Sequence, residues 1–193
     1  MSADLLQSYI SREDEYFQID RQGLEVYRLN RTRLTDLSYQ VVDAFLKDDV
    51  QPKILEVGCG DGSNLLSMLR LHKNLYPENL IGTCLQYLPT HPAVLNTSEI
   101  NIYSEILAEQ LPGNWTRQFD IVMASASLRW SIVDKSAAEL LRVTKKRGYI
   151  MGYDDSETVG KLRKCLFSLG SIKEFEANPS TCESMDGFHF QVI

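Results

Sequence analysis

The chain has 193 residues and a formal net charge of -6, with 44% hydrophobic and 24% charged residues. This length suits one domain, and the composition is that of a globular protein able to bury a sizeable core. The acidic balance argues against an extended nucleic-acid surface, because phosphate backbones are bound by clustered Lys and Arg. We therefore expect no nucleic-acid partner.

The cysteines and the start of the chain bear on the compartment. The four cysteines are widely scattered, at Cys59, Cys84, Cys165 and Cys182. None forms a C-x-x-C pair or a Cys/His cluster at zinc spacing, so no metal is expected. The sequence begins without a basic segment followed by an apolar core, and no run approaches about 18 apolar residues. These features predict a cytoplasmic protein with reduced thiols and no membrane contact.

The first quarter of the chain predicts helices followed by a buried strand. Residues 1–33 are polar and charged and suggest one or two helices. From Leu34 to Phe45 apolar residues recur at helical spacing, and Pro52 cannot continue that helix. The short apolar run at 54–57 is typical of a buried strand.

The stretch K-I-L-E-V-G-C-G-D-G-S-N-L-L at residues 53–66 joins this strand to a helix expected at 63–74. The turn contains Gly58, Gly60 and Gly62. Glycine adopts positive φ and allows close backbone approach, while a helix N-terminus offers free N–H groups to a ligand. A dinucleotide pattern G-x-G-x-x-G would need a glycine where Ser63 stands, which disfavours a nicotinamide-dependent oxidoreductase.

The pattern E-x-G-x-G-x-G that begins at Glu56 resembles motif I of class I S-adenosylmethionine (SAM)-dependent methyltransferases. The resemblance implies an α/β fold with a Rossmann-like, seven-stranded, mostly parallel sheet and helices on both faces. It implies one methyltransferase-like domain over residues 1–193, with a core at 34–193 and a helical cap at 1–33 over the cleft. In that family the glycines pass the amino-acid part of SAM, and the acid at Glu56 lies beside the cofactor. A glycine turn that binds no ligand is the alternative.

The second and third strands carry the main departure from the family. Residues 80–85 predict a strand that in the family commonly ends with an acid holding both ribose hydroxyls of SAM, and Cys84 stands there. A thiol cannot offer a diol the two acceptors of a carboxylate. Either Gln86 substitutes with its amide, or SAM binding is weakened or lost. After a third strand expected at 100–103, Glu105 falls where the family places a polar or acidic group near the adenine.

Residues 118–130, Q-F-D-I-V-M-A-S-A-S-L-R-W, predict the fourth strand and the loop after it. An apolar run ending in small residues suits a parallel strand whose carboxyl end faces a ligand. The stretch resembles methyltransferases acting on small carboxylic acids, such as the trans-aconitate and malonyl-carrier enzymes. The resemblance implies Ala124 and Ser125 beside the cofactor and Arg129 near the acceptor, where a guanidinium would suit a carboxylate. A surface arginine is the alternative reading of Arg129.

A helix with apolar positions from Ala137 to Thr144 is expected to end in the basic run 145–147, with the cations at its C-terminus. Residues 149–153 predict the fifth strand. Tyr153 and Asp154, at its carboxyl end, could contact the substrate or act as a general base. Asp155 or Ser156 is expected to cap the next helix.

The last segments, 171–177 and 187–193, predict the antiparallel pair that closes the sheet. The motif N-P-P-aromatic of enzymes that methylate nucleobase amino groups is absent, so methylation of DNA bases is not expected.

The sequence thus predicts a SAM-dependent methyltransferase acting on an oxygen or nitrogen nucleophile of a small molecule or carrier-bound acid. Candidate catalytic residues are Asp154, Tyr153 and Arg129. Candidate cofactor contacts are Glu56, Gly58, Cys59, Gly60, Gly62, Cys84, Gln86, Glu105, Ala124 and Ser125. The alternative, favoured by Cys84, is a non-catalytic methyltransferase-fold protein with a binding or regulatory role. The sequence leaves the acceptor and the oligomeric state open.

Overall fold

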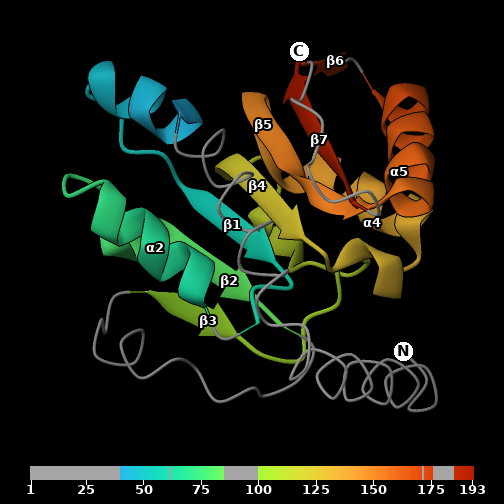
Figure 1. Cartoon of the computed structure of the whole chain (residues 1–193), viewed down its shortest axis with the longest axis horizontal. Coiled ribbons are helices and arrows are strands. Elements are labelled where there is room, and N and C mark those ends of the chain that lie inside the picture. The colour runs from blue at the N-terminus through green and yellow to red at the C-terminus, as the bar shows by residue number, and fades with distance from the viewer. Residues whose placement is uncertain (1–39, 61, 85–99, 171, 176–184) are drawn as a thin grey trace.

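The computed structural model describes residues 40–60, 62–84, 100–170, 172–175 and 185–193. Its seven strands form one sheet in the order β3-β2-β1-β4-β5-β7-β6 (Figure 1). Neighbours from β3 to β5 pair in parallel, whereas β7 is antiparallel to both β5 and β6. The predicted fold class is confirmed. The predicted cap at 1–33 and Gln86 lie outside the described residues and stay predictions.

The elements have the following bounds. The strands are β1 Ile54–Val57, β2 Leu80–Thr83, β3 Asn101–Tyr103, β4 Phe119–Ser125, β5 Thr144–Asp155, β6 Ile172–Glu174 and β7 Met185–Val192. The labelled helices are α2 Ser63–Leu71, α4 Val133–Val143 and α5 Ser156–Leu169, and residues 40–47 are also helical. Short 3-10 turns are η1 Pro77–Asn79, η2 Gly113–Trp115 and η3 Leu128–Trp130.

The sheet is buried on both faces by helices. Successive strand residues point to opposite faces, so Leu55 joins one core cluster and Ile54 the other. The first cluster includes α4 and α5, and the second includes α2 and the helix at 40–47. Parallel strands enclosed in this way are rich in apolar residues, as β1 and β4 are apart from Glu56, Asp120 and Ser125.

The topology places the carboxyl ends of β1, β2, β4 and β5 at one edge. Val57 is level with Thr83 on one side and with Ala124 on the other, and Ser125 is level with Tyr153. From β1 the chain moves outward to β2 and β3, then returns to the other side of β1 with β4. Such a reversal of strand order opens a crevice at the carboxyl edge, where ligands of open α/β sheets bind.

One expectation about local structure is wrong. The helix α4 ends at Val143, and the basic run 145–147 belongs to β5 rather than to a helix C-terminus. Thr144 is already extended (φ -76, ψ 134) and pairs with Phe119 of β4. The Nζ of Lys145 lies 2.8 Å from a carboxylate oxygen of Asp120. The basic run therefore lies within β5, where Lys145 pairs with Asp120, and not at a helix C-terminus facing the helix dipole.

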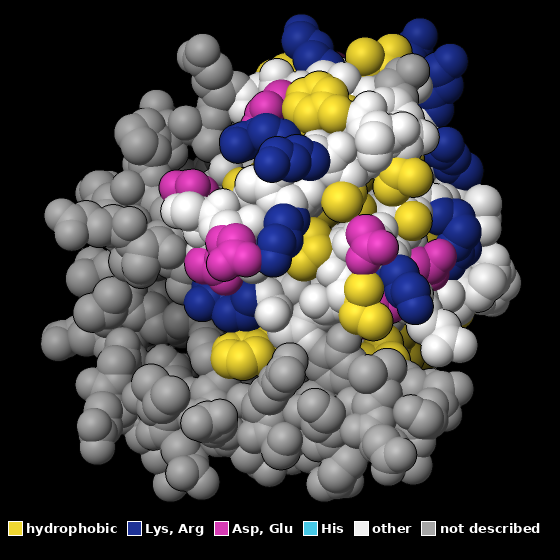
Figure 2. Space-filling model, turned by 90° about the vertical axis from the view of Figure 1, so that its right-hand side faces the viewer, with side chains coloured by type: hydrophobic (Ala, Val, Ile, Leu, Met, Phe, Trp, Pro, Cys, Tyr) yellow, Lys and Arg dark blue, Asp and Glu magenta, His cyan; other side chains and the backbone are white. Residues whose placement is uncertain are grey.

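The outer surface of α4 and α5 carries mixed charges. Figure 2 shows Lys, Arg, Asp and Glu interspersed with scattered hydrophobic side chains on this side of the molecule. On α5, Lys161 pairs with Glu157 at 2.6 Å and Arg163 with Glu174 of β6 at 2.7 Å. Within the described residues, no helix is long and apolar enough to cross a bilayer.

Candidate cofactor and acceptor site

The glycine turn after β1 is built from left-handed residues. Gly58, Gly60 and Gly62 have φ of 73°, 57° and 80°. A Cβ added to Gly58 would lie 2.3 Å from the Cβ of Ser127, whereas one added to Gly60 would meet no atom of the described residues within 4 Å. Gly58 thus allows close packing of the loop after β4, and the described residues leave space beside Gly60. The open space at Gly60 leaves room for a ligand against the backbone.

Glu56 is a buried carboxylate beside this turn. It is 1% exposed, and Nδ2 of Asn64 donates a 2.5 Å hydrogen bond to its Oε1. Asn64 is the second residue of α2. A buried carboxylate is stable only when it is hydrogen-bonded, so Asn64 holds Glu56 in place. The sequence analysis did not single out Asn64, although its position in the first helical turn after the glycines was a usable signal.

Two thiols meet where β1 and β2 end. The backbone N–H of Cys59 donates to the carbonyl of Thr83 at 2.8 Å, which ties the glycine turn to β2. Cys59 and Cys84 are buried, and the Sγ of Cys84 lies 3.8 Å from the carbonyl oxygen of Tyr103. A hydrogen bond between the two thiols and burial raise the pKa of Cys59 far above its usual range. Cys59 therefore stays a neutral thiol, and Cys84 is engaged with its neighbours.

The other candidate cofactor contacts line the same edge. Ala124 is buried and Ser125 is half-buried at the end of β4. Glu105 is exposed just after β3, with a left-handed φ of 60°, and the following N–H of Ile106 donates to the carbonyl of Cys84. The structure therefore gathers the ends of β1 to β4 and the residues after them at one edge of the sheet.

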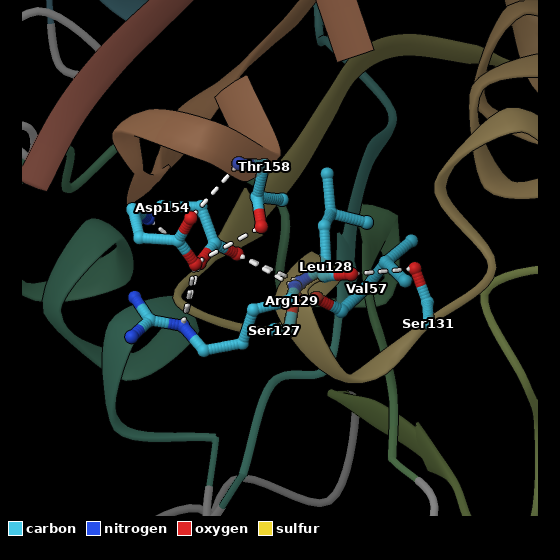
Figure 3. A network of polar contacts seen from close by, with 8 residues as sticks. Val57, Ser127, Leu128, Arg129, Ser131, Asp154 and Thr158 are labelled. Atoms are coloured by element: carbon cyan, nitrogen blue, oxygen red, sulfur yellow. Dashed lines mark hydrogen bonds and ion pairs between the residues drawn. The ribbon is translucent and has the colours of Figure 1, made fainter. Parts of the chain in front are cut away.

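A second polar group lies at the ends of β4 and β5. Asp154 is completely buried, and its carboxylate accepts hydrogen bonds from the backbone N–H groups of Leu128 and Arg129 at 2.9 and 3.1 Å. Nε of Arg129 also donates to it at 2.6 Å (Figure 3). Burial raises the pKa of Asp154, although Arg129 and the backbone donors act to lower it. Tyr153 is 1% exposed, and its carbonyl accepts from the N–H of Ala126 at 2.8 Å.

Asp155, next to Asp154, caps α5. Its side chain accepts from the N–H of Thr158 at 2.8 Å and from the Thr158 hydroxyl at 2.9 Å. The predicted N-cap role of Asp155 is confirmed. These bonds and the nearby Arg129 lower the pKa of Asp155 against the opposing effect of burial, which is the largest single contribution.

Residues 126–130, which we call the β4 loop, connect the two groups. Ala126 has a left-handed φ of 53°, a conformation that costs an alanine about 1 kcal/mol. The Ser127 hydroxyl donates to the carbonyl of Val57 at 2.9 Å, immediately before the glycine turn. Through Ser127 the β4 loop therefore contacts the strand end before the glycine turn. Through Leu128 and Arg129 it contacts Asp154.

Comparison with known families identifies the protein family of this chain. Residues 55–152 match the model of a methyltransferase domain family, from β1 to β5 and over just more than half of the chain. The chain belongs to this methyltransferase family. No curated protein matches the sequence closely enough to be counted as a relative.

Solved structures share the fold of this methyltransferase. The SAM-bound magnesium protoporphyrin IX methyltransferase (ChlM) from Synechocystis PCC 6803 is 12% identical, with a TM-score of 0.61 over 86% of this chain and 81% of its own. A SAM-dependent methyltransferase from Aquifex aeolicus is 16% identical, with a TM-score of 0.58 over 78% and 89%. The CurJ carbon methyltransferase is 14% identical, with a TM-score of 0.56 over 74% of this chain, and the chain spans only 48% of it. Family and fold together identify a class I SAM-dependent methyltransferase domain.

Three features of the carboxyl edge of this methyltransferase suit SAM, and one feature differs from the family pattern. Gly60 leaves open space beside the backbone, and Glu56 supplies a buried carboxylate held by Asn64. The helix α2 begins at Ser63 without a side-chain cap among the described residues, so its first N–H groups can meet a carboxylate. The departure is Cys84, which supplies no carboxylate for the ribose.

Proposed function

We propose that this methyltransferase transfers a methyl group from SAM to an oxygen or nitrogen nucleophile of a small molecule or carrier-bound acid. The observation that carries the proposal is the pairing of open space at Gly60 with the buried carboxylate of Glu56. Bound SAM would supply a methyl group made electrophilic by a positively charged sulfur. A buried carboxylate near that charge favours binding of the cation.

The chain's own residues would contribute mainly position. In-line attack requires the nucleophile to be held at contact distance from the methyl group, and binding energy can supply that alignment. We assign the cofactor side to Gly58, Cys59, Gly60, Gly62 and Glu56, with Cys84, Gln86, Glu105, Ala124 and Ser125 around the ribose and adenine. We assign the acceptor side to the ends of β4 and β5, with Tyr153 and Arg129 there and Asp154 holding Arg129.

Support for the acceptor class comes from structural neighbours. Two structural neighbours are a carbon methyltransferase and a methyltransferase domain of the citrinin polyketide synthase. These neighbours are compatible with a small or carrier-bound acceptor, which we propose on that basis. Within the described residues Cys59, Cys84 and Cys165 form no disulfide, which supports the proposed cytoplasmic setting, where thiols stay reduced.

A second candidate function is a methyltransferase fold that regulates or binds a protein partner without catalysis. The interactions of the Cys84 thiol with Cys59 and with the backbone favour this second candidate. Cys84 stands where the family has the carboxylate that accepts hydrogen bonds from the ribose hydroxyls. The two candidates differ in one measurable property, the affinity for SAM.

Calorimetric titration with SAM and with S-adenosylhomocysteine (SAH) tests the proposal. We expect binding in the micromolar range and thermal stabilisation by both ligands, because anything that binds only the folded state stabilises it. Incubation with SAM carrying a labelled methyl group then screens carboxylic acids, amines and carrier-bound acids as acceptors. Absence of both heat and thermal stabilisation at millimolar SAM would contradict the proposal and favour the regulatory alternative.

The variant Gly60→Val locates the binding site. A branched side chain would fill the space that the described residues leave beside Gly60, so we expect SAH binding to disappear. Because Gly60 has a left-handed φ of 57°, valine also strains the turn, and the melting temperature of the variant is measured beside the titration. Gly113→Val is the control for a branched side chain added where the described residues leave space, in η2, before the start of β4. Unchanged SAH affinity in Gly60→Val would show that the ligand does not pass this glycine.

A further inference from the structure

Both carboxylate oxygens of Asp154 are occupied within the protein. Oδ2 accepts from the N–H groups of Leu128 and Arg129, and Oδ1 accepts from Nε of Arg129 and from the N–H of Asp155 at 2.9 Å. A carboxylate offers about four acceptor positions, and these four bonds fill them. The side chain is 0% exposed, so taking up a proton would break a buried hydrogen bond. This arrangement suits a structural anchor better than a proton acceptor.

The partners of Asp154 belong to the β4 loop, whose other end touches the cofactor turn. Leu128 and Arg129 directly follow Ser127, whose hydroxyl donates to the carbonyl of Val57. The Ser127 side chain also fills the space next to Gly58. A displacement of the loop at Leu128 would therefore move a side chain that packs against the glycine turn, because only one peptide unit separates the two contacts.

The backbone of the loop is strained, which makes an anchor necessary. Ala126 adopts a left-handed conformation that alanine disfavours, and its N–H is bound by the carbonyl of Tyr153. Without Asp154, the N–H groups of Leu128 and Arg129 would lose the carboxylate oxygen that accepts from both, and Leu128 is fully buried. Such a loop would lose the conformation that packs Ser127 against Gly58.

We infer that Asp154 is a positioning residue, which fixes the β4 loop against the glycine turn and thereby sets the affinity for the cofactor. The inference rests on the proposed function, since it concerns the same SAM site. It separates the role of Asp154 from that of a general base. A base would act only on the acceptor, whereas this anchor acts on cofactor binding before any acceptor is present.

The test is a double-mutant cycle on SAH binding, measured by calorimetry with the full chain. We expect Asp154→Asn to weaken SAH binding at least about tenfold, because the amide replaces one pair of acceptors by donors. Ser127→Ala removes the hydrogen bond to the Val57 carbonyl and should weaken binding about fivefold. The double variant should be little weaker than Asp154→Asn, because residues that act through one element are not additive.

Asp120→Asn is the matched control for lost stability. Asp120 also accepts from a backbone N–H, that of Lys53 at 2.8 Å, and pairs with Lys145, but near the start of β4. We expect this variant to melt at a lower temperature and to bind SAH with unchanged affinity. Altered SAH affinity in the control, equal to that of Asp154→Asn, would mean that general destabilisation explains the effect and would overturn the inference.

The outcomes separate this inference from the proposed function. If the unmodified protein binds no SAH, the proposed function fails and the inference falls with it. If the unmodified protein and Asp154→Asn bind SAH equally, only the inference is overturned, as would be expected of a base. Should Asp154→Asn fail to fold, Ser127→Ala carries the test, and unchanged affinity in that variant overturns the inference.

Discussion

Ser127 occupies the space that a side chain on Gly58 would need. A Cβ on Gly58 would lie 2.3 Å from the Cβ and 2.8 Å from the Oγ of Ser127. These residues are far apart in sequence, yet their contact holds the loop after β4 against the turn after β1. The first glycine of the motif is therefore required by packing within the protein as well as by its left-handed φ.

This contact predicts the effect of Gly58→Ala. We expect a loss of about 2–4 kcal/mol in the free energy of unfolding, from the left-handed strain and the overlap with Ser127. Ser127→Gly should destabilise the unmodified protein but stabilise the Gly58→Ala variant, because it removes the overlapping atoms. Urea unfolding of the four proteins measures both effects. The same sign of the Ser127→Gly effect in both backgrounds would show that the overlap is not the cause.

The variant Cys84→Asp tests the departure from the family pattern. A carboxylate at the end of β2 would give the ribose two charge-assisted acceptors, so SAH should bind about tenfold more tightly. The free energy of unfolding should fall, because a charge replaces a buried thiol. Cys84→Ser, which has similar size and no charge, is the control for SAH titration. Weaker binding in Cys84→Asp would mean that the end of β2 does not hold the ribose.

The cysteines should differ strongly in reactivity. Only the thiolate attacks a thiol reagent, and the raised pKa and burial of Cys59 keep it protonated. Cys165 of α5 is partly exposed. In a Cys182→Ser background we expect one thiol to react with an aromatic disulfide reagent at least about a hundredfold faster than Cys59. Adding Cys165→Ser should remove that fast phase, and its persistence would refute the assignment.

His189 should make the stability depend on pH. It pairs with Met151 in the sheet, is 5% exposed, and neither ring nitrogen has a hydrogen-bond partner among the described residues. Burial lowers its pKa to about 4 from the ordinary 6.5. Because the unfolded chain takes up the proton first, the free energy of unfolding should fall as the pH drops from 6.5 to about 4. The loss should reach about 3 kcal/mol, with no further contribution below that range.

The variant His189→Leu should remove this dependence. An apolar side chain leaves no buried nitrogen without a partner, so we expect equal or higher stability at pH 7. His72→Gln is the comparison variant, because it replaces another buried histidine. The Nδ1 of His72 lies 3.1 Å from a carboxylate oxygen of Asp43. Urea unfolding between pH 4 and 7 measures the slopes. An unchanged slope in His189→Leu would place the titrating group elsewhere.

The sequence alone determined the features that depend on neighbouring residues along the chain. The strand–glycine–helix order at 53–66, the apolar strand at 118–125 and the N-cap at Asp155 were all predicted and found. The resemblance of residues 53–66 and 118–130 to class I methyltransferases then implied a mostly parallel sheet of seven strands, which the structure has. These features could be predicted because hydrophobic periodicity, glycine turns and capping act over a few residues.

Only the tertiary structure decided which distant residues meet. The basic run 145–147 lies within β5, between the β4 pairs of Thr144 and Tyr149, against its local resemblance to a helix end. The contacts from Ser127 to Val57 and from Leu128 to Asp154 span 70 and 26 residues of sequence. Parallel strands joined by crossovers bring such segments together at one edge, and no local pattern records which loop will fill which space. The physical reason is that side-chain packing and buried hydrogen bonds depend on distance in space, whereas the sequence patterns depend on distance along the chain.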